Sequence, residues 1–224
     1  MQNLKYLLKR FLYLLYGEKC FKKKNYSWSQ YPLRFEIINK IITKKNYKSY
    51  LEIGCFKNEN FSEIKLNNKV GVDPVSGGTL RMTSDQFFKE NLKMFDIIFI
   101  DGLHVYEQVK KDISNSLKIL NEYGILIIHD CLPRKIWYQN PSRMSRTWNG
   151  DVWKALVECR TLKHIDTYTC LADEGLGIIK KRTNTNHLEI SEINFKKLKY
   201  RDYIKHHNKF MNIINHNQLI NEIS

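Results

Sequence analysis

Two pairs of histidine and aspartate follow apolar segments in the middle of the chain. Asp101 and His104 come after the run "FDIIFI", and His129 with Asp130 come after "GILII". Histidine exchanges a proton near neutral pH, whereas carboxylates either orient such a histidine or bind a divalent cation. These residue types therefore predict proton transfer, metal binding or both.

A second set of candidates lies earlier, in "LEIGCFKNENF" and at the end of "VGVD". Glu52 lies inside an apolar segment, where a carboxylate needs a ligand or a buried hydrogen bond. Gly54 permits a tight turn and lets a ligand approach the backbone closely. Asp73 can accept hydrogen bonds from both hydroxyls of a ribose. Phe56 stands where a dinucleotide-binding motif has its second glycine, which favours a nucleoside without a pyrophosphate.

The elements that must position these residues alternate along the chain. Apolar segments predict strands at residues 49–54, 69–73, 95–101 and 124–130, with helical patterns near residues 59–65, 84–92 and 105–121. This alternation predicts βαβ units with right-handed crossovers and a parallel sheet. Because the carboxyl ends of parallel strands lie at one edge of the sheet, both sets of candidates should meet there.

The second half of the chain predicts further elements of this α/β fold. A long polar and aromatic loop, residues 131–149, precedes a helix at residues 151–160, which Asp151 is expected to cap. Residues 164–170 and 176–181 predict two strands around "ADEG". The short connection between these strands favours an antiparallel hairpin.

The chain resembles class I S-adenosylmethionine (SAM) dependent methyltransferases of the methyltransferase-24-like group. Five segments carry the resemblance, in order and at the expected spacing: "LEIGCFKNENF", "VGVDP", "MTSDQFF", "FDIIFIDGLHVYEQV" and "GILIIHDCLP". Together they cover roughly residues 48–182. The resemblance implies a Rossmann-like α/β fold with a seven-stranded sheet in the order 3-2-1-4-5-7-6, in which strand 7 is antiparallel.

The resemblance also implies positions for the cofactor, SAM. Glu52 and Gly54 would lie beside the methionine part of SAM, and Asp73 would bind the ribose. Asn58 stands where the family usually has a second glycine. Asparagine tolerates a left-handed backbone better than most residues, so this departure should weaken SAM binding without abolishing it.

The segment "MTSDQFF" has two interpretations. The resemblance implies that Ser84 and Asp85 border the adenine of SAM. Thr83 and Gln86, however, match a capping box, so the same residues could simply begin a helix.

Methyl transfer assigns roles to the four residues named first. Methyl transfer to a hydroxyl requires that the hydroxyl lose its proton, and His104 is the best candidate for the general base. Alternatively, Asp101, His129 and Asp130 could bind a divalent cation such as Mg²⁺, which would lower the pKa of the acceptor. Related sugar and macrolide O-methyltransferases have an acidic pair at the end of the fifth strand, and His129 replaces its first member. Because Mg²⁺ prefers oxygen ligands, this replacement argues against the metal and favours a histidine that merely holds a loop.

The loop at residues 131–149 favours an acceptor that has a ring and a negative charge. It contains three aromatic side chains and three arginines: Trp137, Tyr138, Trp148, Arg134, Arg143 and Arg146. These suit a small molecule, a nucleotide sugar or a glycan intermediate as the substrate of O-methylation. The simpler alternative is that the aromatic side chains pack the loop against the domain.

The formal net charge of +14 suggests an anionic partner, but lysine greatly outnumbers arginine. Nucleic-acid sites favour arginine, and no RNA-binding module is recognisable in the sequence. A nucleic-acid substrate is therefore not expected, although RNA methylation stays an alternative function. A non-catalytic scaffold with the methyltransferase fold is a second alternative, which Asn58 favours and the retained Asp101, His104 and Asp130 oppose.

The predicted organisation has three parts: an N-terminal helical extension (1–47), a methyltransferase domain (48–182) and a C-terminal helical tail (183–224). The tail could cover an end of the sheet or mediate a homodimer. Five irregularly spaced cysteines favour a reducing, cytoplasmic location.

Residues 1–17 predict a helix that is too short to span a bilayer. It either packs on the domain or on a partner subunit, or it rests on a membrane surface as a basic amphipathic helix. The second alternative would make the protein membrane-associated.

Overall fold

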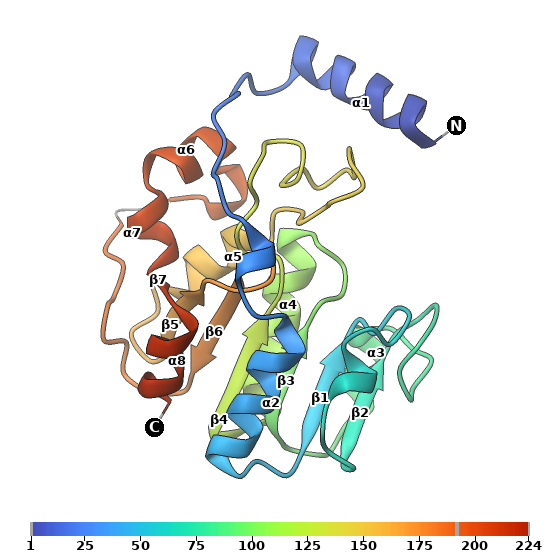
Figure 1. Cartoon of the computed structure of the whole chain (residues 1–224), viewed down its shortest axis with the longest axis vertical. Coiled ribbons are helices and arrows are strands. Elements are labelled where there is room, and N and C mark those ends of the chain that lie inside the picture. Colours follow the sequence, from blue (N-terminus) through green and yellow to red (C-terminus); the bar gives the residue numbers. More distant parts are fainter. Residues whose placement is uncertain (1, 191–192, 224) are drawn as a thin grey trace.

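A seven-stranded mixed sheet forms the centre of the computed structural model, which describes residues 2–190 and 193–223 (Figure 1). The strands are β1 (Tyr50–Ile53), β2 (Lys69–Val72), β3 (Phe95–Ile100), β4 (Leu120–Ile128), β5 (Asp166–Cys170), β6 (Leu176–Lys180) and β7 (Ile213–Ile214). They lie in the order β2-β1-β3-β4-β6-β5-β7. Strands β1 to β4 are parallel, and β6 runs antiparallel to both of its neighbours.

This sheet confirms the predicted fold, including the antiparallel hairpin, and differs from it at the two edges. The predicted outermost strand beyond β2 is reduced to one parallel bridge between Val72 and Leu80. Pro74, Gly77 and Gly78 lie in that segment, and neither residue type favours a strand. At the opposite edge the short β7 pairs with β5.

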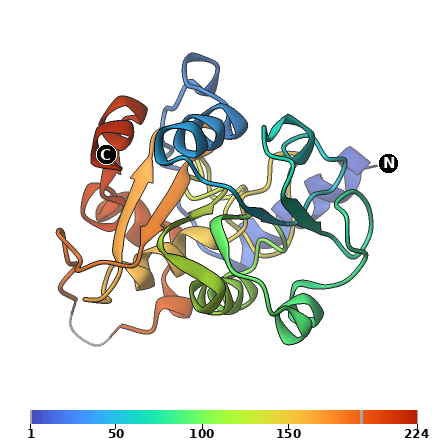
Figure 2. The same ribbon diagram turned by 90° about the horizontal axis from the view of Figure 1, so that it is seen from below.

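Helices cover both faces of the sheet (Figures 1 and 2). The described α-helices are α1 (Gln2–Tyr16), α2 (Arg34–Lys45), α3 (Ser84–Glu90), α4 (Tyr106–Ile119), α5 (Val152–Cys159), α6 (Tyr200–Lys205), α7 (His207–Met211) and α8 (His216–Glu222), and α2 and α8 lie on the face opposite α3, α4 and α5. The helix expected near residues 59–65 is a single 3₁₀ turn, Phe61–Glu63. None of the described helices has both the length and the apolar character needed to cross a bilayer.

Alternate residues of β3 show how the two layers form. Ile97 and Phe99 belong to the cluster that contains the apolar side of α2 and part of α8. Ile98 and Ile100 belong to the opposite cluster, with side chains of α3, α4 and α5. Because successive side chains of a strand point to opposite faces, a strand buried on both faces must be apolar throughout. This burial fixes the strand and thus the position of the residues that follow it.

The helical extensions at the two ends of the chain contribute to the same core. Ile38 and Ile41 of α2 are completely buried, and so is Leu219 of α8. Helix α1 is different, because it lies beyond the loop at residues 131–149, away from the sheet (Figure 1). The division at residues 47 and 182 stays a prediction.

Candidate active site

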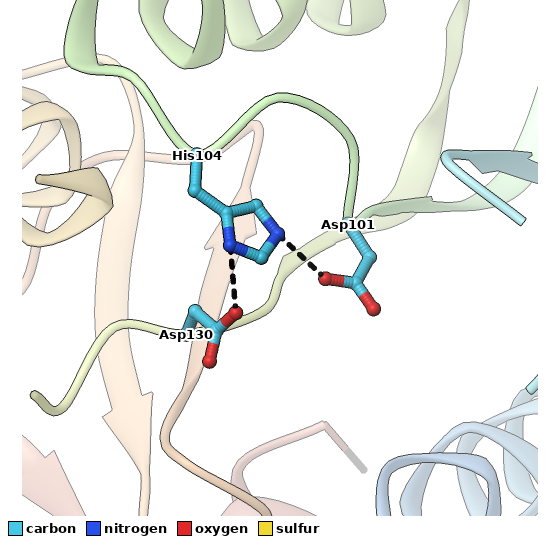
Figure 3. Close-up of side chains that lie close together, drawn as sticks. All are labelled: Asp101, His104 and Asp130. Atoms are coloured by element: carbon cyan, nitrogen blue, oxygen red, sulfur yellow. Dashed lines mark hydrogen bonds and ion pairs between the residues drawn. The ribbon is translucent and has the colours of Figure 1, made fainter. Parts of the chain in front are cut away.

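The imidazole ring of His104 lies between two carboxylates at the carboxyl edge of the sheet (Figure 3). Its Nε2 is 3.2 Å from Asp101 Oδ1, and its Nδ1 is 3.2 Å from Asp130 Oδ2. The backbone oxygen of Trp148 also lies 2.8 Å from Nδ1. The structure thus brings three of the predicted catalytic residues into direct contact.

Strand ends position these three side chains. Asp101 follows β3 directly, and its backbone N–H donates to the oxygen of Ile53 at 2.8 Å, which continues the sheet. His104 lies in the short turn that leads into α4. Asp130 has a φ of 63°, so the backbone after β4 turns through the left-handed region. Asn149 Nδ2 donates to Asp130 Oδ1 at 2.6 Å and fixes the orientation of this carboxylate.

His129, the fourth predicted catalytic residue, is almost completely buried and contacts two of the other three. Its Nδ1 is 3.1 Å from Asp101 Oδ1 and 3.4 Å from Asp130 Oδ2. Its Nε2 lies 3.6 Å from Asp173 Oδ2. The imidazole therefore contacts three carboxylates.

The sequence analysis missed several members of this charged cluster. Arg34, at the start of α2, has its Nη1 2.8 Å from Asp173 Oδ2 and its Nε 4.0 Å from Asp101 Oδ2. Glu174 accepts a hydrogen bond of 3.3 Å from Asn149 Nδ2. Asp173 and Glu174 belong to the "ADEG" segment, whose acidic residues were the one available signal.

The charges of the cluster stabilise one another. Burial would raise the pKa of Asp101, but His129 and His104 hold it far below its usual range. Burial would lower the pKa of His104, but Asp130 and Asp101 raise it to about 9. Asp101 and Asp130 likewise hold the pKa of His129 well above its ordinary value. Near neutral pH both imidazoles carry a proton, and their charges balance those of the carboxylates.

The same residues could hold a cation. One ligand atom each from Asp101, His104 and Asp130 lies within 4.8 Å of the other two. His104, rather than the predicted His129, completes this group. The predicted metal set with His129 stays a prediction, although that imidazole also contacts both carboxylates.

The turn after β1 lies against this cluster. Gly54 has a φ of +89°, and a Cβ at this position would lie 2.3 Å from the backbone oxygen of Asp101. Only glycine fits here. Asn58 has a φ of 64°, so it adopts the left-handed conformation that the sequence analysis considered, and its Oδ1 accepts from Gly78 N at 2.7 Å.

Asp73 lies at the end of β2, as its predicted role in binding the ribose requires. Its two carboxylate oxygens accept hydrogen bonds of 2.8 Å each from the backbone N–H groups of Phe56, Val75 and Ser76. Burial would raise the pKa of Asp73, but these bonds lower it below its usual value. Arg81 Nη1 also lies 3.8 Å from Asp73 Oδ1, so the protein itself engages most of this carboxylate, and its contact with the ribose stays a prediction.

Glu52 satisfies its carboxylate within the protein. Its Oε2 accepts hydrogen bonds from Tyr50 Oη and from Asn60 Nδ2, the latter at 2.8 Å. Burial raises the pKa of Glu52 to about 7, despite these donors. The buried hydrogen bond, one of the two predicted alternatives, is thus present, and the role beside methionine stays a prediction.

Ser84 and Asp85 begin helix α3, and the capping box between Thr83 and Gln86 is present. Gln108 of α4 donates to Ser84 Oγ at 3.2 Å and to Asp85 Oδ1 at 3.1 Å. The structure does not bring them to the histidine cluster. The predicted contact of these two residues with adenine stays a prediction.

The loop at residues 131–149 places an aromatic ring on the site. Trp148 stacks on the imidazole of His104, with ring centroids 5.0 Å apart. Arg134, in contrast, donates to the backbone oxygen of Tyr26, and Arg143 donates to backbone oxygens of its own loop, those of Ser145 and Arg146. Two of the three arginines proposed for an anion therefore hold the loop in place.

The prediction that Asp151 caps its own helix is wrong. The structure shows no hydrogen bond from its side chain to the N-terminus of α5. Its Oδ1 instead accepts from the N–H of Tyr106, at the start of α4, at 2.7 Å. This bond joins the end of the loop to the helix that follows His104.

Residues 51–131 match a family model described as a methyltransferase domain. No curated protein matches the chain. Among solved structures, a protein from Staphylococcus aureus assigned as a caffeoyl-CoA O-methyltransferase is similar, with 16% identity, a TM-score of 0.51 and coverage of 80% of this chain and 99% of that one. A protein from Klebsiella pneumoniae assigned as an O-methyltransferase gives 11% identity, a TM-score of 0.51 and coverage of 82% and 100%. At these identities the likeness establishes the fold.

Proposed function

The prediction of a class I SAM-dependent methyltransferase is confirmed by the domain match and the fold, and from this premise we propose that the chain methylates an oxygen atom of a small molecule or glycan intermediate. One observation carries the proposal. The backbone of Gly54 touches that of Asp101, so the turn that would hold SAM adjoins the residues that can remove a proton.

The residues of the first two strand ends fit the cofactor. The absence of a side chain at Gly54 lets the turn after β1 pack against the backbone of Asp101, and Asp73 follows β2, where a ribose ligand is expected. When bound, SAM supplies an electrophilic methyl group. The protein must hold the acceptor oxygen in line with this group, and such positioning lowers the barrier by about 7 to 11 kcal/mol in favourable cases.

His104 is the residue that we assign as the general base. Both of its ring nitrogens face carboxylates, which increases its affinity for a proton. With a pKa of about 9 the imidazole is protonated near neutral pH, so it must first lose this proton. The rate should therefore rise with pH as the free imidazole becomes more abundant.

A divalent cation could take over the role of that proton. Asp101 and Asp130 would hold it through oxygen atoms, and its charge would lower the pKa of an acceptor hydroxyl. The balance of charges favours this arrangement, because a cation would replace the protons that the two histidines carry.

The acceptor that we propose has a ring, because Trp148 stacks on His104 and offers an apolar wall at the site. Arg134 and Arg143 donate to backbone oxygens and so are engaged within the protein. A negative charge on the acceptor is therefore less well supported than a ring.

The proposal can be tested with SAM labelled in its methyl group and a panel of acceptors. Catechols, uridine diphosphate sugars and bulk RNA would be offered with and without a chelator, and SAM binding would be measured by calorimetry. We expect SAM binding and label on a phenol or sugar oxygen. Label on RNA alone would instead support RNA methylation, and failure to bind SAM would support the scaffold alternative.

A further inference from the structure

Helix α1 exposes a continuous apolar face to solvent. Large apolar side chains with exposed fractions from 46 to 87% lie along it: Leu4, Leu7, Leu8, Phe11, Leu12, Leu15 and Tyr16. In a helix with 3.6 residues per turn these positions share one broad side. Isolated exposed leucines are ordinary, but a cluster of this kind marks an interaction surface.

The opposite side of α1 attaches the helix to the protein. Lys9 Nζ donates to Ser142 Oγ at 3.1 Å, and Arg10 Nε donates to the oxygen of Met144 at 2.8 Å. The ring of Tyr13 meets the ring of Trp137 edge-on at 5.7 Å. A helix on a globular protein normally buries its apolar side and exposes its polar side, and α1 does the reverse.

Basic side chains surround this apolar face. Residues 1–24 contain seven lysines and arginines and one acidic residue, Glu18. The carboxylate of Glu18 accepts hydrogen bonds from the N–H groups of Tyr200 and Arg201, so its charge is engaged at the start of α6. Lys5, Lys19, Lys22 and Lys23 are exposed.

A cavity of about 620 Å³ extends the positive charge from this segment onto the loop. Lys23, Lys24, Arg134 and Lys135 are among the residues that line it. None of the described residues that line it is acidic. The apolar helix face suits the hydrocarbon layer of a lipid bilayer, and the adjoining lysines suit the phosphate groups above that layer.

We propose that α1 lies in the surface of an anionic lipid bilayer, with its apolar face inserted and the neighbouring lysines on lipid phosphates. At 15 residues the helix is roughly 22 Å long, which suits a position in the plane of the interface. A stable protein partner is less suited to this face, because such interfaces engage about 20 to 30 residues on each side.

Membrane binding would orient the candidate active site. The loop at residues 131–149 contacts α1 through Trp137 and Ser142, and it contacts His104 through Trp148. The bilayer would therefore lie on the side of the molecule on which this loop covers the site. The binding itself does not depend on the proposed chemistry, so the two proposals can fail separately.

Flotation with lipid vesicles tests the proposal on the full chain. We expect it to float with vesicles of phosphatidylcholine and phosphatidylglycerol and to stay behind with vesicles of phosphatidylcholine alone. Replacing Leu8, Phe11 and Leu15 by Glu should weaken binding to the anionic vesicles by more than about tenfold, because three large apolar side chains leave the lipid. Replacing Lys19, Lys22 and Lys23 by Glu should also weaken it.

The control replaces Leu92 and Tyr123, two large apolar residues outside α1 that are more exposed than Leu8, Phe11 and Leu15, by Glu. This variant should float like the unaltered chain. Equal binding to neutral vesicles, or no vesicle binding by the unaltered chain, would overturn the proposal. The unaltered chain could instead form a dimer in light scattering and not bind vesicles. If only the variant at Leu8, Phe11 and Leu15 were then monomeric, the apolar face would be assigned to contact with a second copy of the chain.

Discussion

The two halves of the carboxyl edge of the sheet are built in different ways. The nucleotide half, named for its proposed role, comprises Gly54, Asn58 and Asp73 and depends on backbone conformation and on backbone N–H groups. The acid–base half, also named for its proposed role, comprises Asp101, His104, His129 and Asp130 and depends on charged side chains that balance one another. The halves meet where Gly54 touches Asp101.

This difference separates what each half contributes. A carboxylate held by backbone N–H groups keeps its position and charge over a wide pH range, which suits the binding of a neutral ribose. A cluster of histidines and carboxylates changes its charge when a proton or a cation arrives, which suits acid–base chemistry. Substitutions in the nucleotide half should therefore change SAM affinity, and those in the acid–base half should change the rate.

The largest effect is expected for His104→Ala. If His104 removes the proton from the acceptor, its loss should slow methyl transfer by about two to four orders of magnitude. SAM affinity should stay nearly unchanged, because the ring nitrogens contact Asp101, Asp130 and the backbone oxygen of Trp148, none of which belongs to the nucleotide half. Single-turnover rates with an identified acceptor and calorimetry with SAM measure the two quantities.

His164→Ala, at an exposed position, is the control for this variant. A mechanism through a cation instead predicts activity that a chelator abolishes, that a divalent ion restores and that depends most on Asp101 and Asp130. If the His104 variant were fully active in the presence of chelator, neither mechanism would stand.

The next largest effect, on the pH dependence of stability, is expected for Glu52, a buried residue of β1. Its pKa of about 7 in the folded protein exceeds the ordinary value of 4.5, so the folded state holds its proton more tightly than the unfolded state does. The contribution of Glu52 to stability should therefore fall as pH rises from about 4.5 to 7, by about 3 kcal/mol in total. Glu52→Gln should remove this part of the pH dependence.

Urea unfolding at several pH values measures that change. Glu59→Gln alters an exposed glutamate of the same loop and should leave the pH dependence as it is. If the Glu52 variant and the unaltered chain lost stability in parallel as pH rises, the carboxyl group of Glu52 would not be protonated in the folded protein.

Asp73→Ala should weaken SAM binding by about 1.5 to 3 kcal/mol, because it removes a charged acceptor from the ribose. Asp96→Ala is a matched control, since Asp96 also accepts from backbone N–H groups, those of Lys48 and Ser49, but at the opposite edge of the sheet. Both variants lose hydrogen bonds from backbone N–H groups, but only Asp73→Ala should lose affinity for SAM in calorimetry. Equal affinities would remove Asp73 from the cofactor site.

The sequence predicts the nucleotide half better than the acid–base half. Gly54 was identified because a turn after a buried strand requires a particular backbone conformation, which is a local property. Asn58 was identified because the family that the chain resembles usually has a glycine there. The four residues of the acid–base half were also found, since each follows a strand. Local patterns also predicted the hairpin of β5 and β6, whereas the order of the central strands was implied by the family resemblance.

The residues that complete the acid–base half could not be predicted, because tertiary packing alone brings them there. Arg34 reaches Asp173 across 139 positions of the chain, and no periodicity marks such a pair. Asn149 reaches Asp130 from the end of a loop whose path a sequence does not define. The cap of Asp151 on α4 is a contact of the same kind.

The smallest effect is expected from deleting residues 1–17, which tests whether the nucleotide half is complete without α1. The helix contacts the loop that covers the acid–base half, through Lys9 with Ser142 and Tyr13 with Trp137, whereas the nucleotide half follows β1 and β2 (Figure 1). Changes at separated sites usually couple by less than about 0.5 kcal/mol, so SAM affinity should stay within about twofold. Calorimetry on the truncated chain, after circular dichroism has shown that it is folded, measures this. A folded chain that no longer binds SAM would place α1 in the cofactor site and would end the separation of the two halves.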